Sequence, residues 1–190
     1  MKKNLLIIIL LMFFVVITKA QQVPNFTLTN VMNGKMVSLD TYPSCTGVAI
    51  IFTSNGCAFD EYYRGRIGKL SKDYQDKVPV LLVNSSPDPL ESVDNMSRKA
   101  QQLGLSMPYL ADKDQTLMQS LGATKSPQVF LLKNDGGKFS VVYKGALDDN
   151  AQVEADVRHA YLKDAIDILL TNQKIETPEV RPIGCTIRRK

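Results

Sequence analysis

A cysteine stands where a buried strand is expected to give way to a helix. The segment FTSNGCAFD, residues 52–60, follows the apolar run 48–51 and places Cys57 at this junction. A thiolate is the nucleophilic form of cysteine, and the N-terminus of a helix stabilises it, which lowers the thiol pKa below about 8.5. Ser54 lies three residues earlier, so the junction cannot form a Cys-x-x-Cys disulfide. We predict a reactive Cys57, the alternative being a small buried side chain in a decayed site.

The chain has two further cysteines that could form a disulfide with Cys57. Cys45 precedes the strand that Cys57 follows; the strand spans about 20 Å, whereas bridged Cα atoms lie within about 7 Å, so these two should not pair. Cys185 lies in the C-terminal tail, which could extend about 45 to 50 Å and so reach either of the others. Paired with Cys57, it would be a resolving thiol that attacks a sulfenic acid or a mixed disulfide. Paired with Cys45, it would be a structural clasp, and both pairings remain open.

The elements that must position these cysteines alternate along the chain. Nearly continuous apolar runs predict buried strands at 47–53 and 78–86. Glycine turns predict hairpins at 25–42 and 127–145. Alternating elements indicate an α/β fold with right-handed crossovers. Helices are expected at 57–74, at 90–103, at 114–122 with Asp114 as cap and Gly122 as stop, and at 157–170.

The beginning of the chain has the pattern of a secretory signal peptide. Lys2 and Lys3 precede an apolar block at 5–17, and Ala20 offers a small residue for cleavage. The block is shorter than the roughly 20 residues that span a bilayer, so we expect no permanent membrane anchor after cleavage and a periplasmic or secreted protein. The expected divisions are a signal peptide at 1–20, one folded domain at 21–171 and a tail at 172–190.

Charge and composition indicate which partners and cofactors the chain is not expected to bind. Removal of the signal peptide lowers the formal net charge from +4 to +1, and this near-balance gives no support to nucleic-acid binding. His159 is the only histidine, the three cysteines are scattered, and no glycine-rich phosphate loop follows a strand. We therefore expect neither a metal nor a cofactor.

The spacing of Ser54 and Cys57 before a helix, with Ser126–Pro127 directly before the last hairpin, resembles the thioredoxin superfamily. The segments VPNFTLTNVMNGKMVSLD and RPIGCTI are most similar to its redoxin and alkyl-hydroperoxide-reductase-like branch, often called peroxiredoxin-like. The resemblance implies a central mixed β-sheet flanked by helices, with an N-terminal β-hairpin and an extended C-terminal tail. It also implies a cis-proline at Pro127 beside Cys57, although cis bonds are only a few per cent of X-Pro bonds.

The chain departs from this branch at positions that bear on its chemistry. Members usually carry Cys-x-x-Cys followed by proline, whereas Ser54 and Ala58 occupy those positions here. A serine three residues before a lone cysteine resembles the peroxiredoxins, in which the hydroxyl orients the peroxide. Asp60 and Glu61 would disfavour the thiolate if they face the sulfur, and Lys125 is our candidate for a compensating positive charge.

The signal-peptide pattern and the resemblance together imply an exported redox enzyme, a thiol-dependent oxidoreductase or peroxidase that uses Cys57 for thiol–disulfide exchange or hydroperoxide reduction. Ser54 would orient the thiol, Pro127 would shape the substrate face and Cys185 would resolve the intermediate. Its partners would be protein thiols or disulfides, or a hydroperoxide, together with an external thiol reductant. Two alternatives remain: a catalytically degenerate module that binds extended polypeptide, and a one-cysteine thiol peroxidase.

Overall fold

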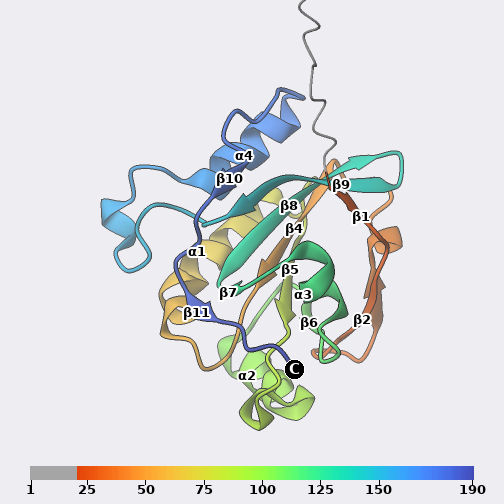
Figure 1. Cartoon of the computed structure of the whole chain (residues 1–190), viewed down its shortest axis with the longest axis vertical. Helices are drawn as coiled ribbons and strands as arrows, with labels where there is room; N and C mark the ends of the chain where they lie inside the picture. Colours follow the sequence, from red (N-terminus) through yellow and green to blue (C-terminus); the bar gives the residue numbers. More distant parts are fainter. Residues whose placement is uncertain (1–20) are drawn as a thin grey trace, which may run out of the picture.

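The computed structural model describes residues 21–190, which form a twisted mixed sheet with helices on both faces (Figure 1). The predicted signal peptide lies outside the described residues. Within 21–190, no helix is both long and apolar enough to cross a membrane. The helices are α1 (Ala58–Tyr74), α2 (Val93–Leu103), α3 (Thr116–Leu121) and α4 (Tyr161–Leu170). The strands are β1 (Gln22–Val23), β2 (Thr27–Asn30), β3 (Met36–Ser38), β4 (Gly47–Phe52), β5 (Val80–Asn84), β6 (Tyr109–Ala111), β7 (Lys125–Ser126), β8 (Gln128–Asp135), β9 (Lys138–Gly145), β10 (Glu179–Val180) and β11 (Cys185–Thr186).

The large sheet has the strand order β1-β9-β8-β4-β5-β6-β2-β3, and β10 adds to it alongside β9. Strand β4 runs parallel to β5 and antiparallel to β8, and β5 runs parallel to β6. All six residues of β4 are buried, which confirms that the apolar run at 47–53 is a central strand. Because β5 and β6 follow helices, the parallel part of the sheet is built from strand–helix–strand units.

Alternate residues of the central strands lie in two hydrophobic cores, one on each face of the sheet. Ala49 and Ile51 of β4 face a core that is completed by α1, α2 and α4. Val48, Ile50 and Phe52 face the opposite core, which contains α3 and residues of the N-terminal hairpin. Two covered faces explain why β4 and β5 are continuously apolar, since neither side of either strand meets water.

Two helices differ in detail from the sequence-based expectation. The last helix, expected from 157, begins at Tyr161, and His159 lies just before it with its ring stacked on that of Tyr161. The prediction that Asp114 caps α3 was wrong. Asp112 instead accepts the backbone N–H groups of Leu117 and Met118, at 3.2 and 2.9 Å. Asp114 is exposed, whereas Asp112 is fully buried, so the buried carboxylate has the stronger need for these donors.

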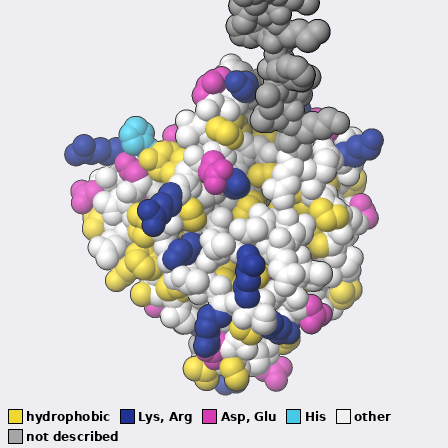
Figure 2. Space-filling model, in the orientation of Figure 1, with side chains coloured by type: hydrophobic (Ala, Val, Ile, Leu, Met, Phe, Trp, Pro, Cys, Tyr) yellow, Lys and Arg dark blue, Asp and Glu magenta, His cyan; other side chains and the backbone are white. Residues whose placement is uncertain are grey.

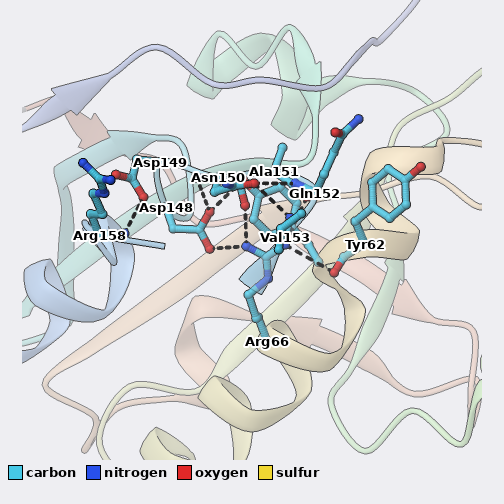
Figure 3. A network of polar contacts seen from close by, with 10 residues as sticks. Tyr62, Arg66, Asp148, Asp149, Asn150, Ala151, Gln152, Val153 and Arg158 are labelled. Carbon is cyan, nitrogen blue, oxygen red and sulfur yellow. Dashed lines mark hydrogen bonds and ion pairs between the residues drawn. The ribbon is translucent and has the colours of Figure 1, made fainter. Parts of the chain in front are cut away.

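A buried ion pair fastens the loop after β9 to helix α1 (Figure 3). The Arg66 guanidinium pairs with the Asp148 carboxylate and also donates to the carbonyl groups of Asn150 and Ala151, at 2.8 and 3.0 Å. The same guanidinium lies 4.1 Å from the centre of the Tyr63 ring, and the Tyr63 hydroxyl donates to Asp148 at 3.1 Å. The charges are therefore paired and hydrogen-bonded, as buried charges must be if the fold is to tolerate them.

The C-terminal tail returns across the molecule after α4, as the dark blue segment in Figure 1 shows. Strand β10 pairs in parallel with β9, and β11 then pairs antiparallel with β7, placing Cys185 opposite Ser126. Gly184 permits this approach, because a Cβ atom at that position would overlap the Ser126 carbonyl oxygen. Through these two pairings the tail contacts both the edge of the large sheet and the loop that precedes β8.

Candidate active site

Cys57 is the N-cap residue of α1, with an extended backbone at φ −95° and ψ 121°. It follows the carboxyl end of β4, and only 4% of its surface is exposed. The first backbone N–H groups of α1 have no carbonyl partner within the helix, so a negative charge on the sulfur would be stabilised there. The structure thus places the cysteine at a strand-to-helix junction, where the sequence predicted it.

Cys57 forms a disulfide with Cys185, which lies 128 residues away in the sequence, and their Cα atoms are 6.0 Å apart. Of the two pairings left open by the sequence, this is the one that the structure contains. Cys45 is the free cysteine of the described chain. It lies just before β4, at the end of that strand opposite Cys57, and burial and then the charge of Asp76 raise the pKa of its thiol.

The peptide bond between Ser126 and Pro127 is cis. It lies between β7 and β8, and the Ser126 carbonyl oxygen is 3.1 Å from Cys57 Sγ. A disulfide sulfur carries no proton, so this contact can become a hydrogen bond only after reduction, when the Cys57 thiol could donate to the carbonyl group. Pro127 and Cys57 are therefore brought together through the backbone of Ser126.

Ser54 lies close to Ser126. Its hydroxyl oxygen is 3.4 Å from Ser126 Oγ, and its backbone N–H donates to Asp60 Oδ2 at 3.1 Å. The Ser126 hydroxyl donates to the same carboxylate oxygen. Residues from the end of β4, from the first turn of α1 and from β7 thus form one hydrogen-bonded group next to Cys57.

Asp60 is the buried carboxylate of this group. Burial raises its pKa to about 6, although the hydrogen bonds from Ser126 and Ser54 favour the ionised form. Its Oδ1 atom has no hydrogen-bond partner among residues 21–190. Since the pKa lies near neutrality, this carboxyl group can gain or lose a proton beside the disulfide.

The charges that the sequence placed near Cys57 are distributed differently in the structure. Glu61 is exposed and pairs with Arg64 at 2.8 Å, so of the two acidic residues only Asp60 joins the hydrogen-bonded group next to Cys57. Lys125, the candidate for a compensating charge, donates instead to Thr186 Oγ1 in the tail, at 3.0 Å. The lysine therefore contacts the strand that carries Cys185.

Glu91 is a residue of the site that the sequence analysis missed. It lies at the end of a short 3-10 helix (Pro89–Glu91), is 5% exposed, and accepts the backbone N–H groups of Asn55 and Gly56 at 3.0 and 2.9 Å. It also accepts the Asn84 side-chain amide at 2.7 Å. Glu91 thus fixes the loop that leads into Cys57. Nothing in the polar run after β5 distinguished this glutamate from a solvent-exposed one.

A cavity of about 160 Å³ opens beside Cys57. The end of β4, the first turns of α1 and the loop after α2 form its walls, and Cys57, Ser54 and Asp60 are among the lining residues. Its volume is large enough for a small molecule. Among the residues that the structure describes, no group of three or more His, Cys, Asp or Glu side chains is placed to hold a metal ion.

Comparison with known proteins identifies the family. The Redoxin family model matches residues 18–161, which is most of the chain. The chain belongs to the Redoxin family. This match and the strand order confirm the thioredoxin-like α/β fold expected from the sequence, with helices flanking a mixed sheet. None of the curated proteins compared with the chain matches it.

Solved structures extend the comparison of this redoxin chain. It is 29% identical to an uncharacterized conserved protein from Geobacillus kaustophilus, with a TM-score of 0.80, covering 90% of this chain and 92% of that one. A hypothetical protein from Sinorhizobium meliloti 1021 is 28% identical with a TM-score of 0.79, covering 90% and 94%. An exposed lipoprotein thioredoxin from Streptococcus pneumoniae is 21% identical with a TM-score of 0.59, covering 76% and 99%, and this likeness supports the fold alone.

Proposed function

We propose that the protein is an exported thiol–disulfide oxidoreductase whose redox couple is Cys57 and Cys185. The observation that carries the proposal is the disulfide between them, formed at the N-terminus of α1 and against the cis-proline loop. The Redoxin family and the thioredoxin-like fold support the reaction class. In one turnover the protein disulfide accepts two electrons from a dithiol, or the protein dithiol gives two electrons to a disulfide.

The surrounding residues would each assist this exchange. The free N–H groups of α1 would stabilise the Cys57 thiolate whenever the disulfide opens. Asp60, with a pKa of about 6, would take up the proton that a thiol loses near neutral pH. Ser54 would orient the thiol and Pro127 would shape the substrate face, as the family resemblance implied. Export would place the protein where disulfides persist, which fits a tail held by one.

Catalysed reduction of insulin disulfides, with dithiothreitol as the final reductant, tests the proposal. We expect the wild type and the control Cys45→Ser to accelerate the reaction equally, and both Cys57→Ser and Cys185→Ser to lose this acceleration. Equal acceleration by Cys57→Ser and the wild type would contradict the proposed couple, as would no acceleration by the wild type. Circular dichroism of each variant separates lost chemistry from lost folding.

The cavity beside Cys57 supports hydroperoxide reduction as a second candidate function. Ser54 and Cys57 both line it, and its volume admits a small peroxide. The Cys57 thiolate would attack one peroxide oxygen, giving a sulfenic acid and releasing water or an alcohol, and Cys185 would then form the disulfide with release of water. This cycle uses two cysteines, so the disulfide favours it over a one-cysteine peroxidase. Consumption of hydrogen peroxide that is lost in Cys57→Ser is the expected result, and no consumption by the wild type would exclude this activity.

A further inference from the structure

The two cysteines of the disulfide are unequally exposed. Cys57 is 4% exposed, whereas Cys185 is half-buried on a two-residue strand at the surface. Thiol–disulfide exchange requires a thiolate to approach the attacked sulfur from the side opposite its bonded partner, so access decides which sulfur reacts. A large partner therefore meets Cys185 more readily than Cys57.

The surroundings of Cys57 strengthen this difference. The Ser126 carbonyl oxygen lies 3.1 Å from its sulfur, and the Ser126 hydroxyl is bonded to the buried Asp60 carboxylate. The carbonyl group therefore blocks the approach of a thiolate to Cys57 Sγ from that side. The cavity of about 160 Å³ beside Cys57 is lined by residues of the loop after β4, of α1 and of the loop after α2.

The leaving group favours the same direction of attack. Attack on Cys185 expels Cys57 as a thiolate at the N-cap of α1, a helix of 17 residues, where N–H groups and the helix dipole stabilise it. Attack on Cys57 would expel Cys185 from β11, which lies at no helix terminus. Because a thiol of lower pKa leaves faster, Cys57 is the better leaving group.

We propose that a partner protein's thiol enters at Cys185, and that Cys57 is the internal thiol. The inference rests on the proposed function and reverses the roles expected from the sequence for reaction with proteins. The partner thiolate forms a disulfide with Cys185 Sγ while the bond between Cys185 and Cys57 breaks, and the electron pair stays on Cys57 Sγ. A second thiolate of the partner then attacks its own bonded sulfur and releases Cys185. The partner leaves with a disulfide, and two electrons remain on the protein dithiol.

The tail is anchored so that Cys185 stays near Cys57 while it carries the partner. Beyond the pairing of β11 with β7, the buried Gln115 side chain donates to the Arg188 carbonyl at 2.7 Å and accepts the Lys190 N–H at 2.8 Å. Arg188 pairs with Asp88 at 2.8 Å. None of these contacts involves the two sulfur atoms, so they can hold the tail in place after the disulfide opens and keep the effective concentration of the two sulfurs high.

The charge of the tail indicates the chemistry of the partner. Exposed basic side chains surround Cys185 in the sequence, and Figure 2 shows Lys and Arg side chains over the face on which the tail lies in Figure 1. The exposed basic residues of the tail near Cys185 in the sequence are Arg181, Arg188, Arg189 and Lys190; of these, Arg188 pairs with Asp88 and Lys190 with Asp114, at 3.8 Å. A cysteine flanked by acidic residues would be attracted to this surface, and the attraction would weaken with salt. We therefore assign acidic protein thiols as the partner class.

The test uses the oxidised protein with its native disulfide and two unstructured peptides, each with one cysteine. One peptide has glutamates beside the cysteine and its matched control has lysines. After brief mixing, acid stops the exchange, N-ethylmaleimide blocks free thiols, and mass spectrometry of proteolytic fragments locates the peptide. We expect the peptide on Cys185 and maleimide on Cys57, in at least about tenfold excess over the reverse. At low salt the glutamate peptide should react about tenfold faster than the lysine peptide.

The outcomes separate this inference from the proposed function. Peptide attached mainly to Cys57 overturns the assignment of Cys185 and leaves the redox couple intact. Attachment to Cys185 with equal rates for the two peptides overturns the acidic partner class. Attachment to neither cysteine, with the disulfide unchanged, overturns the redox couple and this inference together.

Discussion

Two buried carboxylates, one in the first turn of helix α1 and one in the loop that packs on this helix, have different surroundings. Asp148 is paired with the Arg66 guanidinium and also accepts from the Tyr63 hydroxyl and a backbone N–H group (Figure 3). Asp60 accepts from the neutral Ser126 hydroxyl and the Ser54 N–H, and burial raises its pKa to about 6. The first arrangement stabilises the ionised Asp148 carboxylate inside the fold. The second leaves a carboxyl group that titrates near neutral pH beside a disulfide.

This difference indicates that Asp148 stabilises the fold, whereas Asp60 can take part in proton transfer. A buried charge that is paired from several directions contributes rigidity, and its removal leaves the partner charge exposed to the apolar interior. A buried carboxylate without a counter-charge lowers stability when it is ionised, and such groups persist where proton transfer or electrostatics is useful. The same substitution should therefore have opposite effects at the two positions.

The largest effect is expected for Asp148→Asn. The change leaves Arg66 buried without a negative partner, so the free energy of unfolding should fall by about 3 to 5 kcal/mol. Urea unfolding at pH 7 measures it, with Asp149→Asn as the control because that neighbouring aspartate is exposed. The control should remain close to the wild type. A loss below about 1 kcal/mol at Asp148 would show that the two carboxylates do not differ in this way.

Asp60→Asn should produce a smaller change of opposite sign. The folded state binds the Asp60 proton more tightly than the unfolded state, since its pKa is raised from 3.8 to about 6. Between these pH values the folded wild type holds more protons, so its stability falls as pH rises, by up to about 3 kcal/mol. Asparagine cannot ionise, and its advantage over the wild type should appear above pH 6. Unfolding of the oxidised proteins at pH 4 and pH 8 checks this, and parallel pH profiles would contradict it.

Removal of one hydroxyl donor from each carboxylate sharpens the comparison. Tyr63→Phe removes a donor to Asp148, which remains paired with Arg66, and should cost about 1 to 2 kcal/mol at pH 5 and pH 8 alike. Ser126→Ala removes a donor to Asp60 and should cost about 2 kcal/mol at pH 8, where Asp60 is ionised, and about 1 kcal/mol at pH 5. Denaturant unfolding at the two pH values measures both variants. Equal pH dependence in the two variants is the result that this account does not allow.

Lys125→Met should have the smallest effect. The Lys125 ammonium group bonds to Thr186 in the tail, so its removal should shift the pKa of Asp60 by less than about 0.5 unit. The stability change should remain within about 0.5 kcal/mol. The midpoint of the wild-type stability decline between pH 4 and pH 6 reports the Asp60 titration, and a large displacement of this midpoint in Lys125→Met would reveal a cation acting on the site.

The sequence predicted those features that depend on local patterns. Continuous apolar residues identified β4, helical spacing identified α1, and the strand-to-helix junction located Cys57. The resemblance to redoxins named the fold, which the family match and the strand order confirm. These inferences succeeded because the spacing of apolar residues in a strand or a helix depends on which of its faces are buried.

Features that depend on contacts between residues far apart in the chain could not be predicted from the sequence. The pairing of Cys185 followed from the return of the tail to β7, and the length of the tail alone permitted either cysteine. The role of Glu91 depended on a loop 35 residues earlier in the chain. Asp112 was overlooked in favour of Asp114 because the two differ in burial and not in residue type. In each case tertiary contacts, rather than local propensity, decide what a polar side chain does.

The central claim is that Cys57 and Cys185 form a reversible redox couple. Equilibration of the protein in graded mixtures of reduced and oxidised dithiothreitol, followed by acid quenching, alkylation and mass mapping, tests it most directly. We predict one two-electron transition in which Cys57 and Cys185 become alkylated together, while Cys45 is alkylated across the whole series. Free Cys57 and Cys185 in every mixture, or a bond between Cys185 and Cys45, would contradict it.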